Sequence, residues 1–308
     1  VRELTQRGYE VYILDSFEKE AHAGGRKNYT LGKGVKVTRG SVANTPLLKR
    51  LLSKAEGIIH LASLVGVGQS MYEISRYVHE NTFATSVLLD VLVNFENSVK
   101  KLVVASSASV YGEGKYRCDA CQIEVWPDQR RTSNLQEQRW EHICNRCGSI
   151  LTPVPTDEES PSRPQSIYGI TKKTQEDMCL MIAKTRGLPA VALRYFNVYG
   201  PGQSLSNPYT GVCTIFASLI LSGHRPFIFE DGKQIRSLIH VKDVAKANVD
   251  ALEANLDSQV AINIGNPVPS TVLEVAQVLL EAYGSNLKPY ISNTYRPGDI
   301  RHYYPKMD

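Results

Sequence analysis

The chain alternates between short apolar runs and longer segments whose apolar positions follow a helical pattern. The runs are rich in β-branched residues and end in polar or glycine-containing turns, which is typical of strands buried in a sheet. We expect strands at residues 9–15, 35–39, 58–63, 101–112, 189–201 and 261–265. The run at 101–112 ends in several hydroxyl side chains, and ligands bind at the carboxyl ends of such strands.

Helices are expected between these runs. Residues 1–8 look like the end of an amphipathic helix closed by a glycine, and further helices are expected from residue 166, up to residue 221 and from residue 241. The strongest helical pattern covers residues 71–95. Its candidates for buried or interface positions are Tyr77, Val78, Asn81, Val87, Leu88 and Leu92.

Tyr168 and Lys172 lie four residues apart just after Pro161 and Pro164, at the start of a predicted helix. Positions i and i+4 share one helix face, so the ammonium can lie beside the phenol. A free tyrosine has a pKa near 10, and an adjacent cation can lower that pKa by about 1–3 units. We therefore expect Tyr168 to be a proton acceptor, although the spacing alone is common on surface helices.

The composition is that of a globular protein. The 308 residues are 42% hydrophobic and 21% charged, which is enough for a large core in one or two domains. The formal charge of +4 is modest, and no basic run or basic aromatic patch predicts nucleic-acid binding. No stretch approaches the roughly 20 apolar residues of a membrane span, and no leader opens the chain. A cytoplasmic location is expected by default.

Four of the six cysteines form two C-x-x-C pairs with the spacing of a metal site. The pairs are Cys118 with Cys121 and Cys144 with Cys147. Four thiolates would complete a tetrahedron and leave no position for water, so we expect a structural metal, and zinc in particular. Four surface thiols are the alternative, whereas disulfides would need an oxidising compartment. Cys179 and Cys213 have no partner motif and are expected to be small core residues.

Five motifs follow one another along the chain. They are Ser-Ser-Ala-Ser-Val-Tyr-Gly at 106–112, Tyr168-x-x-x-Lys172, Arg-Tyr-Phe-Asn-Val-Tyr-Gly-Pro at 194–201, Arg236 followed by His-Val-Lys-Asp at 240–243, and Arg-Pro-Gly-Asp at 296–299. In this set and order the chain resembles the extended short-chain dehydrogenase/reductase family, and within it the nucleotide-sugar epimerases. The resemblance extends over nearly the whole chain.

The resemblance implies an α/β fold, a Rossmann-type doubly wound parallel sheet with a smaller C-terminal substrate domain and an inserted four-cysteine zinc-binding loop. The expected parts are a truncated NAD-binding Rossmann domain at 1–112, a zinc-ribbon-like insertion at 113–155, the Rossmann continuation with the catalytic helix at 156–200, and a mainly substrate-binding domain at 201–308, of which 239–266 returns to the Rossmann sheet. Relatives form homodimers through the helix at 71–95 and the helix after Tyr168.

NAD is the implied cofactor. Asp15 ends a strand, and such an acid holds the adenosine ribose, with a glycine fingerprint about 20 residues earlier. That distance passes beyond Val1, so the first strand and its glycine turn are expected to be missing from this chain. The residues expected around NAD are Asp15, Ser41, Val42, Leu61, Ala62, Ser63, Asn81, Tyr168 and Lys172. Ser41 departs from the acid that relatives usually carry there.

The implied reaction is epimerisation at C4 of a nucleotide-diphosphate sugar through a 4-keto intermediate. Tyr168 would accept the proton of the sugar 4-hydroxyl while the carbon gives a hydride to NAD, Ser107 would share that proton, and Lys172 would hold the nicotinamide ribose. A guanidinium suits the diphosphate because it forms bidentate bonds with phosphate. The expected substrate contacts are Ser107, Asn197, Arg236 and Arg296.

Alternatives remain open. A 4,6-dehydratase of the same fold carries an Asp-Glu pair directly after the catalytic hydroxyl, where this chain has Ala108 and Ser109. Another nucleotide-sugar epimerase is a second possibility, and a non-catalytic fragment or scaffold without the glycine turn is a third. Residues 66–74, the cysteine insertion and residues 205–211 together resemble the dTDP-L-rhamnose 4-epimerase type.

Overall fold

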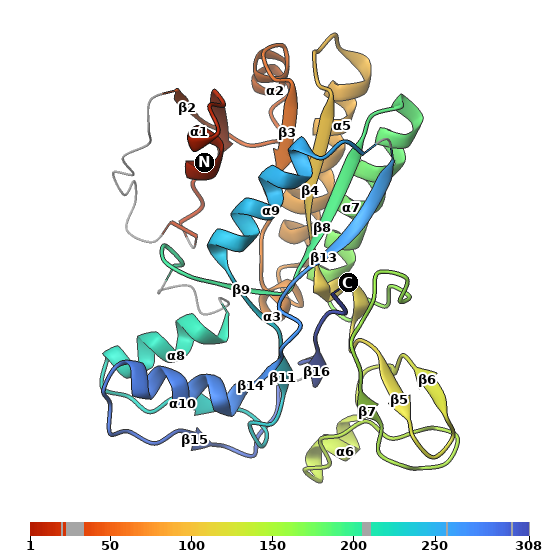
Figure 1. Ribbon diagram of the computed structural model, residues 1–308, viewed down its shortest axis with the longest axis vertical. Coiled ribbons are helices and arrows are strands. Elements are labelled where there is room, and N and C mark those ends of the chain that lie inside the picture. Colours follow the sequence, from red (N-terminus) through yellow and green to blue (C-terminus); the bar gives the residue numbers. More distant parts are fainter. Residues whose placement is uncertain (20, 23–33, 205–210, 257, 297, 308) are drawn as a thin grey trace.

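The computed structural model describes residues 1–19, 21–22, 34–204, 211–256, 258–296 and 298–307 (Figure 1). The helices are α1 (Arg2–Gln6), α2 (Thr45–Leu52), α3 (Val67–Ser70), α4 (Ile74–Tyr77), the π-helix η1 (Val78–Phe83), α5 (Ala84–Asn94), the 3₁₀ helix η2 (Ala108–Tyr111), α6 (Thr132–Gln136), α7 (Ile167–Arg186), α8 (Val212–Leu221), α9 (Val241–Glu253) and α10 (Val272–Ala282).

The strands run from the amino-terminal region to the last described residues. They are β1 (Val11–Asp15), β2 (Val35–Arg39), β3 (Gly57–His60), β4 (Lys101–Ser107), β5 (Tyr116–Cys118), β6 (Ile123–Val125), β7 (Thr152–Pro153), β8 (Ala190–Tyr195), β9 (Asn197–Tyr199), β10 (Phe227–Ile228), β11 (Ile235–Arg236), β12 (Leu238–His240), β13 (Gln259–Ile264), β14 (Ser270–Thr271), β15 (Tyr290–Ile291) and β16 (His302–Tyr303).

A parallel sheet in the order β13-β8-β4-β3 forms the centre of the molecule, as the apolar runs predicted. The strands β1 and β2 form a separate parallel pair, and β12 pairs with β9. The expected Rossmann-like α/β arrangement is therefore present, with its parallel strands divided between these sheets. The predicted strand at 35–39 has the observed bounds, whereas the run at 101–112 ends its strand at Ser107 because η2 follows.

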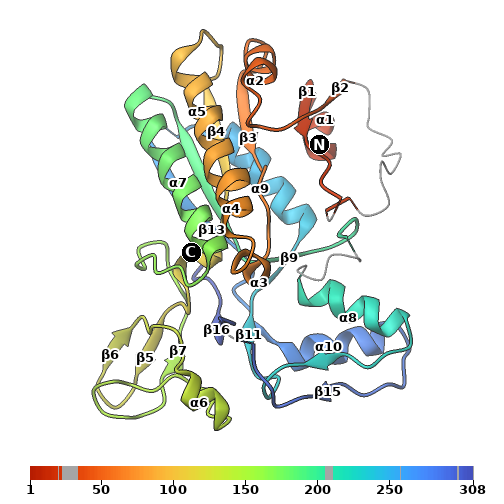
Figure 2. The same cartoon turned by 180° about the vertical axis from the view of Figure 1, so that it is seen from behind.

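Helices cover both faces of the central sheet. Leu102 and Val104 pack with residues of α5 and α7, while Val103 between them packs on the other face with Ala251 of α9. Figure 1 shows α9 in front of the sheet, and Figure 2 shows α5 and α7 in front of it from behind. Because both faces are covered, the middle of the strand is apolar at successive positions from Leu102 to Ala105, which explains the continuous run seen in the sequence.

Two smaller units extend from the carboxyl ends of these strands, with β11 and β16 between them in both views (Figures 1 and 2). One contains α8, α10, β10 and β15, and its core includes Phe216, Ile228 and Val275. The other is the segment 113–155, which we call the insertion, and it contains α6 and the antiparallel sheet β6-β5-β7.

The helical segment predicted at 71–95 is not a single α-helix. It contains α4, the π-helical turn η1 and α5. Tyr77, Asn81, Leu88 and Leu92 are buried as predicted, but the Val78 side chain is 43% exposed. The apolar pattern predicted which residues are buried or belong to an interface, but it could not tell these two groups apart. No described helix has both the length and the apolar character that crossing a bilayer requires.

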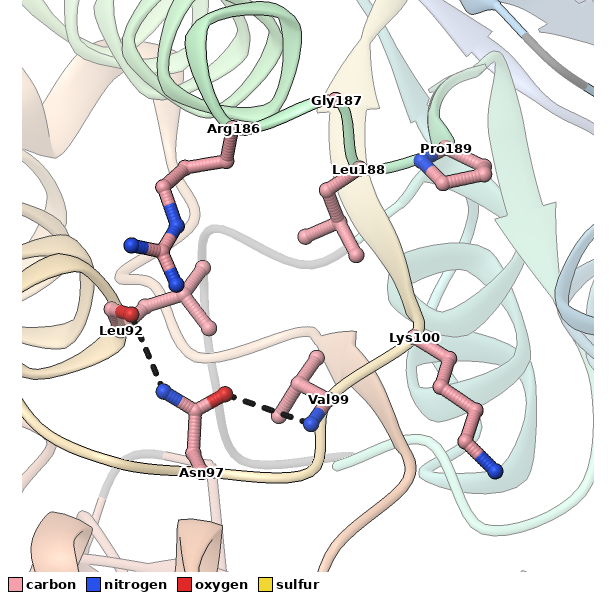
Figure 3. Close-up of a pocket in the computed structure, with 8 residues that line it drawn as sticks. All are labelled: Leu92, Asn97, Val99, Lys100, Arg186, Gly187, Leu188 and Pro189. Atoms are coloured by element: carbon pink, nitrogen blue, oxygen red, sulfur yellow. Dashed lines mark hydrogen bonds between the residues drawn. The ribbon is translucent and has the colours of Figure 1, made fainter.

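A surface pocket with a volume of about 250 Å³ lies where α5 and α7 end (Figure 3). Asn97 shapes it by donating a hydrogen bond to the Leu92 carbonyl at 3.0 Å and accepting one from the Val99 N–H at 3.2 Å. Lys100 and Pro189 lie directly before β4 and β8, so this pocket is at the amino ends of the strands. Ligands of such sheets bind at the opposite ends.

Candidate active site

The helix α7 begins directly beside the end of β4 and carries Tyr168 and Lys172 on its buried face. The two residues are 7% and 2% exposed. Ser166 caps the helix by accepting a hydrogen bond from the Gly169 N–H at 3.0 Å. The Tyr168 N–H is bound in turn by Ser70 Oγ of α3, also at 3.0 Å. Two of the N–H groups that a helix start leaves without intrahelical partners are therefore held by serines, which orients the phenol.

Ser107 is brought to Tyr168 by the strand that ends in it. As the last residue of β4 it accepts a hydrogen bond from the Ser109 N–H at 3.1 Å, and its side chain also hydrogen-bonds to Tyr168. The sheet and α7 thus place together the two hydroxyls that the sequence assigned to one proton transfer. Their roles stay predictions.

The predicted lowering of the Tyr168 pKa is not found in this structure. Burial raises that pKa to about 12, although the hydrogen bond with Ser107 acts in the opposite direction. Lys172 is not among the causes of this shift, and burial lowers its own pKa to about 8. The i, i+4 argument took the phenol and ammonium as solvated groups, whereas both are deep in the protein, where desolvation disfavours the charged form of each.

Lys172 lies in a small buried network of neutral groups. Its Nζ donates to Gln175 Oε1 at 2.9 Å and approaches Ser63 Oγ at 3.5 Å. Gln175 donates in turn to Thr85 Oγ1 at 2.8 Å and to the Ala62 carbonyl at 3.3 Å. Burial lowers the pKa of the neighbouring His60 to about 3, so this imidazole is neutral at physiological pH.

The loop after β3, predicted to lie beside the cofactor, is held against α7 by Asn81. Asn81 Oδ1 accepts a hydrogen bond from the Leu64 N–H at 2.6 Å, and its Nδ2 donates to the Leu64 carbonyl at 3.1 Å and to Thr171 Oγ1 at 3.0 Å. Its side chain is therefore fully engaged with protein groups. Leu61, at the start of the loop, is exposed.

Asp15, Ser41 and Val42 belong to the β1–β2 side of the molecule. Asp15 ends β1 and accepts a hydrogen bond from the Phe17 N–H at 2.7 Å. Ser41 Oγ accepts from the Ala43 N–H at 3.0 Å, and Val42 packs against the core cluster that contains Leu48. Within the part of the chain that the structure describes, no hydrogen bond or ion pair joins these three residues to Tyr168 or Lys172.

Tyr303, which sequence reasoning missed, connects the expected substrate contacts with Tyr168. Its hydroxyl donates to Asn197 Oδ1 at 2.9 Å, its ring stacks on Phe196 at 5.5 Å, and the Arg236 guanidinium lies 5.2 Å from its ring centre. Tyr303 also contributes to the raised pKa of Tyr168. A tyrosine in the short strand β16 has no periodic or motif signal that could have revealed it.

The two arginines expected to bind diphosphate differ in their surroundings. Arg236 donates to the carbonyls of Ile235, Arg301 and Ile300 at 2.8, 2.9 and 2.7 Å. Arg296 is half exposed, donates to Asp299 Oδ2 at 2.8 Å and lies over the Phe229 ring at 4.6 Å. The motif at 205–211 falls almost wholly outside the described residues, so only Gly211 of it has a described structure.

The four cysteines of the insertion come together, as their spacing predicted. The Sγ atoms of Cys118, Cys121, Cys144 and Cys147 all lie within 4.8 Å of one another, and Cys118 and Cys147 are 3.5 Å apart. The Cys121 N–H points to Cys118 Sγ at 3.4 Å. Cys179 is buried in the core between α7 and the sheet, as expected, whereas Cys213 is only partly buried.

Comparison with known proteins agrees with this geometry. The model of the NAD dependent epimerase/dehydratase family matches residues 1–133 and 148–265, with its break inside the insertion. A dTDP-L-rhamnose 4-epimerase of Burkholderia thailandensis is 32% identical over 97% of this chain and 81% of that protein. A UDP-N-acetyl-alpha-D-glucosaminuronate decarboxylase of Bacillus cytotoxicus is 27% identical over 93% of this chain and 76% of that protein.

Solved structures give the same result. A UDP-glucose 4-epimerase of Thermotoga maritima, solved with UDP-glucose, has a TM-score of 0.77 at 27% identity and covers 99% of this chain and 84% of its own. A UDP-N-acetylglucosamine 4-epimerase of Methanobrevibacter ruminantium has a TM-score of 0.76 at 27% identity, over 97% and 82%. The family model spans far more than half of the residues, and the chain belongs to the NAD dependent epimerase/dehydratase family.

Proposed function

We propose that this protein is an NAD-dependent isomerase that epimerises C4 of a nucleotide-diphosphate sugar, with a substrate similar to dTDP-L-rhamnose. The observation that carries the proposal is the buried group of Ser107, Tyr168 and Lys172 at the carboxyl end of β4, in a chain 32% identical to a dTDP-L-rhamnose 4-epimerase.

The residues near Lys172 suit the ribose of a nicotinamide nucleotide. Lys172 is a buried ammonium that forms no ion pair within the described chain, and its bonds go to the neutral oxygens of Gln175 and Ser63. Neutral ribose hydroxyls are therefore suitable further partners. Asp15, at the end of β1, would hold the second ribose of the cofactor. When bound, oxidised NAD would supply the hydride acceptor at the sugar carbon.

The protein's own residues would handle the proton. Tyr168 Oη would take the proton of the sugar 4-hydroxyl, and Ser107 Oγ would bind the same oxygen and share that proton. A pKa of about 12 keeps the phenol protonated without ligands, so the positive charge of the oxidised nicotinamide would have to lower it on binding. The 4-keto sugar would then have to turn within the site, so that hydride could return to its other face.

Elimination of water, the dehydratase alternative, is less well supported. It requires an acid and a base beside the catalytic hydroxyl, but Ala108 is buried and the Ser109 hydroxyl is bonded to Ser107. Glu176 lies two turns along α7 from Tyr168, and its carboxylate is bound by Arg194 at 2.7 and 3.0 Å. The side chains that follow Ser107 therefore contain no carboxylate for the second step.

The proposal includes a structural zinc on the four cysteines. A tetrahedral ZnS₄ site with bonds of about 2.3 Å has sulfur atoms roughly 3.8 Å apart, which is compatible with the 4.8 Å limit found here. It also includes a homodimer, because Met71, Ile74, Val78 and Phe83 on the α3–α5 segment and Met181 on the adjacent α7 are exposed apolar residues. Reduced thiols favour a cytoplasmic location.

The test uses the purified protein with NAD and a panel of nucleotide sugars that includes dTDP-L-rhamnose and UDP-glucose, in D₂O and followed by NMR. Hydride transfer to and from C4 returns the same hydrogen, so we expect a C4 epimer without deuterium on carbon. A dehydratase would place solvent deuterium next to the carbonyl and lose the 6-hydroxyl. Absence of any C4 epimer across the panel would overturn the proposal.

A further inference from the structure

The insertion does more than hold four cysteines, because one of its acidic side chains reaches β16, the strand that pairs with the strand of Arg236. We propose that Glu113 and Glu141 are positioning residues for the Arg236 guanidinium and thereby set the affinity for the substrate diphosphate. This inference rests on the proposed function, in which Arg236 binds that diphosphate.

The first step is the way Arg236 is oriented. Three of its N–H groups donate to the carbonyls of Ile235, Ile300 and Arg301. Two of the five N–H groups of a guanidinium thus remain without a partner among the residues that the structure describes. The direction in which these two N–H groups point depends on the positions of the carbonyls of Ile300 and Arg301.

The second step is the way these carbonyls are held. The Arg301 N–H donates to Glu113 Oε2 at 2.8 Å, and both groups are buried. The Arg301 side chain is 0% exposed and donates through Nε to Glu141 Oε1 at 3.0 Å. Glu141 also binds His302 Nε2 at 2.8 Å, and His302 Nδ1 accepts the Ile235 N–H at 3.1 Å. Glu113 therefore holds Arg301, whose carbonyl accepts a hydrogen bond from Arg236. Glu141 holds Arg301 and His302, and His302 binds Ile235, the residue before Arg236.

The third step is a second set of contacts between the insertion and the same segment, made by Arg130. Arg130 binds Glu230 with two hydrogen bonds of 2.9 and 2.8 Å and donates to the Asp299 carbonyl at 2.8 Å. Glu230 in turn accepts from Arg301 at 2.9 Å. The segment 299–302 is thus bound by three charged residues of the insertion, Glu113, Glu141 and Arg130.

The charge states support a fixed arrangement. Burial alone would raise the pKa of Glu141, but hydrogen bonds from His302 and Arg301 bring it down to about 2. The carboxylate is therefore charged at any pH at which the protein is assayed. Losing Glu141 leaves the fully buried Arg301 with two acids, Glu230 and Asp231, in place of three, so the bonds that hold this segment weaken.

The experiment compares Glu141→Gln, Glu113→Gln and Glu113→Ala with Glu137→Gln, an exposed acid of the same insertion that pairs with exposed Arg139. For Glu141→Gln and Glu113→Ala we expect KM for the nucleotide sugar and Kd for UDP or dTDP, by calorimetry, to rise about tenfold, equivalent to one lost charge-assisted hydrogen bond. The value of kcat and the Kd of NAD should change less than twofold. The KM and Kd values of Glu113→Gln should lie between those of the wild type and of Glu113→Ala, because its amide oxygen still accepts a hydrogen bond from the Arg301 N–H.

The plain alternative is that these acids only stabilise the fold. In that case the midpoint of thermal unfolding falls while KM, Kd for the nucleotide and kcat stay at wild-type values, and the inference is wrong. Glu141 has a side chain 31% exposed, so its variant can be examined even if the Glu113 variants fail to fold. If the wild-type protein itself turns over no nucleotide sugar, the proposed function fails instead, while nucleotide binding still tests the positioning of Arg236.

Discussion

Ser70 Oγ accepts a hydrogen bond from the backbone N–H of Tyr168 at 3.0 Å, so α3 caps the helix that carries the candidate proton acceptor. Ser70 is fully buried and its hydroxyl donates to the Val67 carbonyl at 2.7 Å. The glycine-rich segment around α3 therefore has a definite relation to Tyr168, which its sequence does not reveal.

We predict that Ser70→Ala weakens this relation. It should cost about 1–2 kcal/mol of stability, as for the loss of a helix cap, and lower kcat roughly tenfold with unchanged NAD affinity. Ser86→Ala is the matched control, because Ser86 makes the same bond to a carbonyl three residues earlier, while no described hydrogen bond links its hydroxyl to α7. Equal effects in both variants would contradict the proposed role of Ser70. Chemical denaturation and initial rates provide the measurements.

Tyr168→Phe should lower turnover by about 10²–10⁴-fold while NAD stays bound, because only the group that exchanges the proton is lost. Tyr77→Phe is the control, since Tyr77 lies edge-on to Tyr168 at 6.4 Å and its hydroxyl donates to Gln69 instead. Rates of C4 epimerisation and bound cofactor should be measured on the same samples. A Tyr168→Phe enzyme with near wild-type turnover would rule out the assignment.

The buried Lys172 should make stability depend on pH in the absence of nucleotide. Its pKa is about 8 in the folded protein against the ordinary value of 10.5, so between these values the unfolded chain binds more protons at this group. Stability conferred by this position therefore rises with pH in that window and is lowest below pH 8. Lys172→Met, which carries no such charge, should be the more stable protein near neutral pH.

We expect the advantage of Lys172→Met over wild type to shrink by about 2 kcal/mol between roughly pH 7.5 and pH 9.5. Urea denaturation at several pH values measures it. Lys173→Met is the control, since Lys173 lies on the same helix and pairs with Asp177 at the surface. A difference between the Lys172 variant and wild type that does not change with pH would show that the ammonium is not desolvated.

Zinc should be present at one ion per chain after purification without added metal, and Cys144→Ser should lose it. Cys213→Ser should keep the ion, because Cys213 lies in α8, away from the cysteine cluster. Loss of the ion should lower the unfolding temperature, since a structural metal contributes directly to folding. A wild-type protein without metal, measured by plasma emission spectroscopy, would exclude the site.

Much of the fold could be predicted because burial on both faces of a sheet leaves a continuous apolar run, as at Leu102 to Val104. Residues linked by a local motif, such as Cys118 and Cys121, were likewise found from spacing. Contacts between residues distant in sequence could not be predicted in this way. Glu113 and Arg301 are 188 positions apart, and Ser70 and Tyr168 are 98 apart. The upward shift of the Tyr168 pKa was missed because the spacing of residues in a sequence does not show whether they are buried.

The π-helical turn η1 has a consequence for chain length. A π turn contains one residue more than an α turn, so one residue between Val78 and Phe83 could be deleted with both flanking helices kept intact. Because the wide turn takes up the extra residue, such a deletion would convert it to an α turn and leave α4 and α5 in nearly their present orientation. Asn81 lies inside this turn, so its bonds with Leu64 and Thr171 would be disturbed while Tyr77 stays beside the ring of Tyr168. A shortened chain of this kind should therefore fold and keep its phenol in place yet hold the loop after β3 less firmly, which makes η1 a place where a one-residue length change separates folding from the anchoring of that loop.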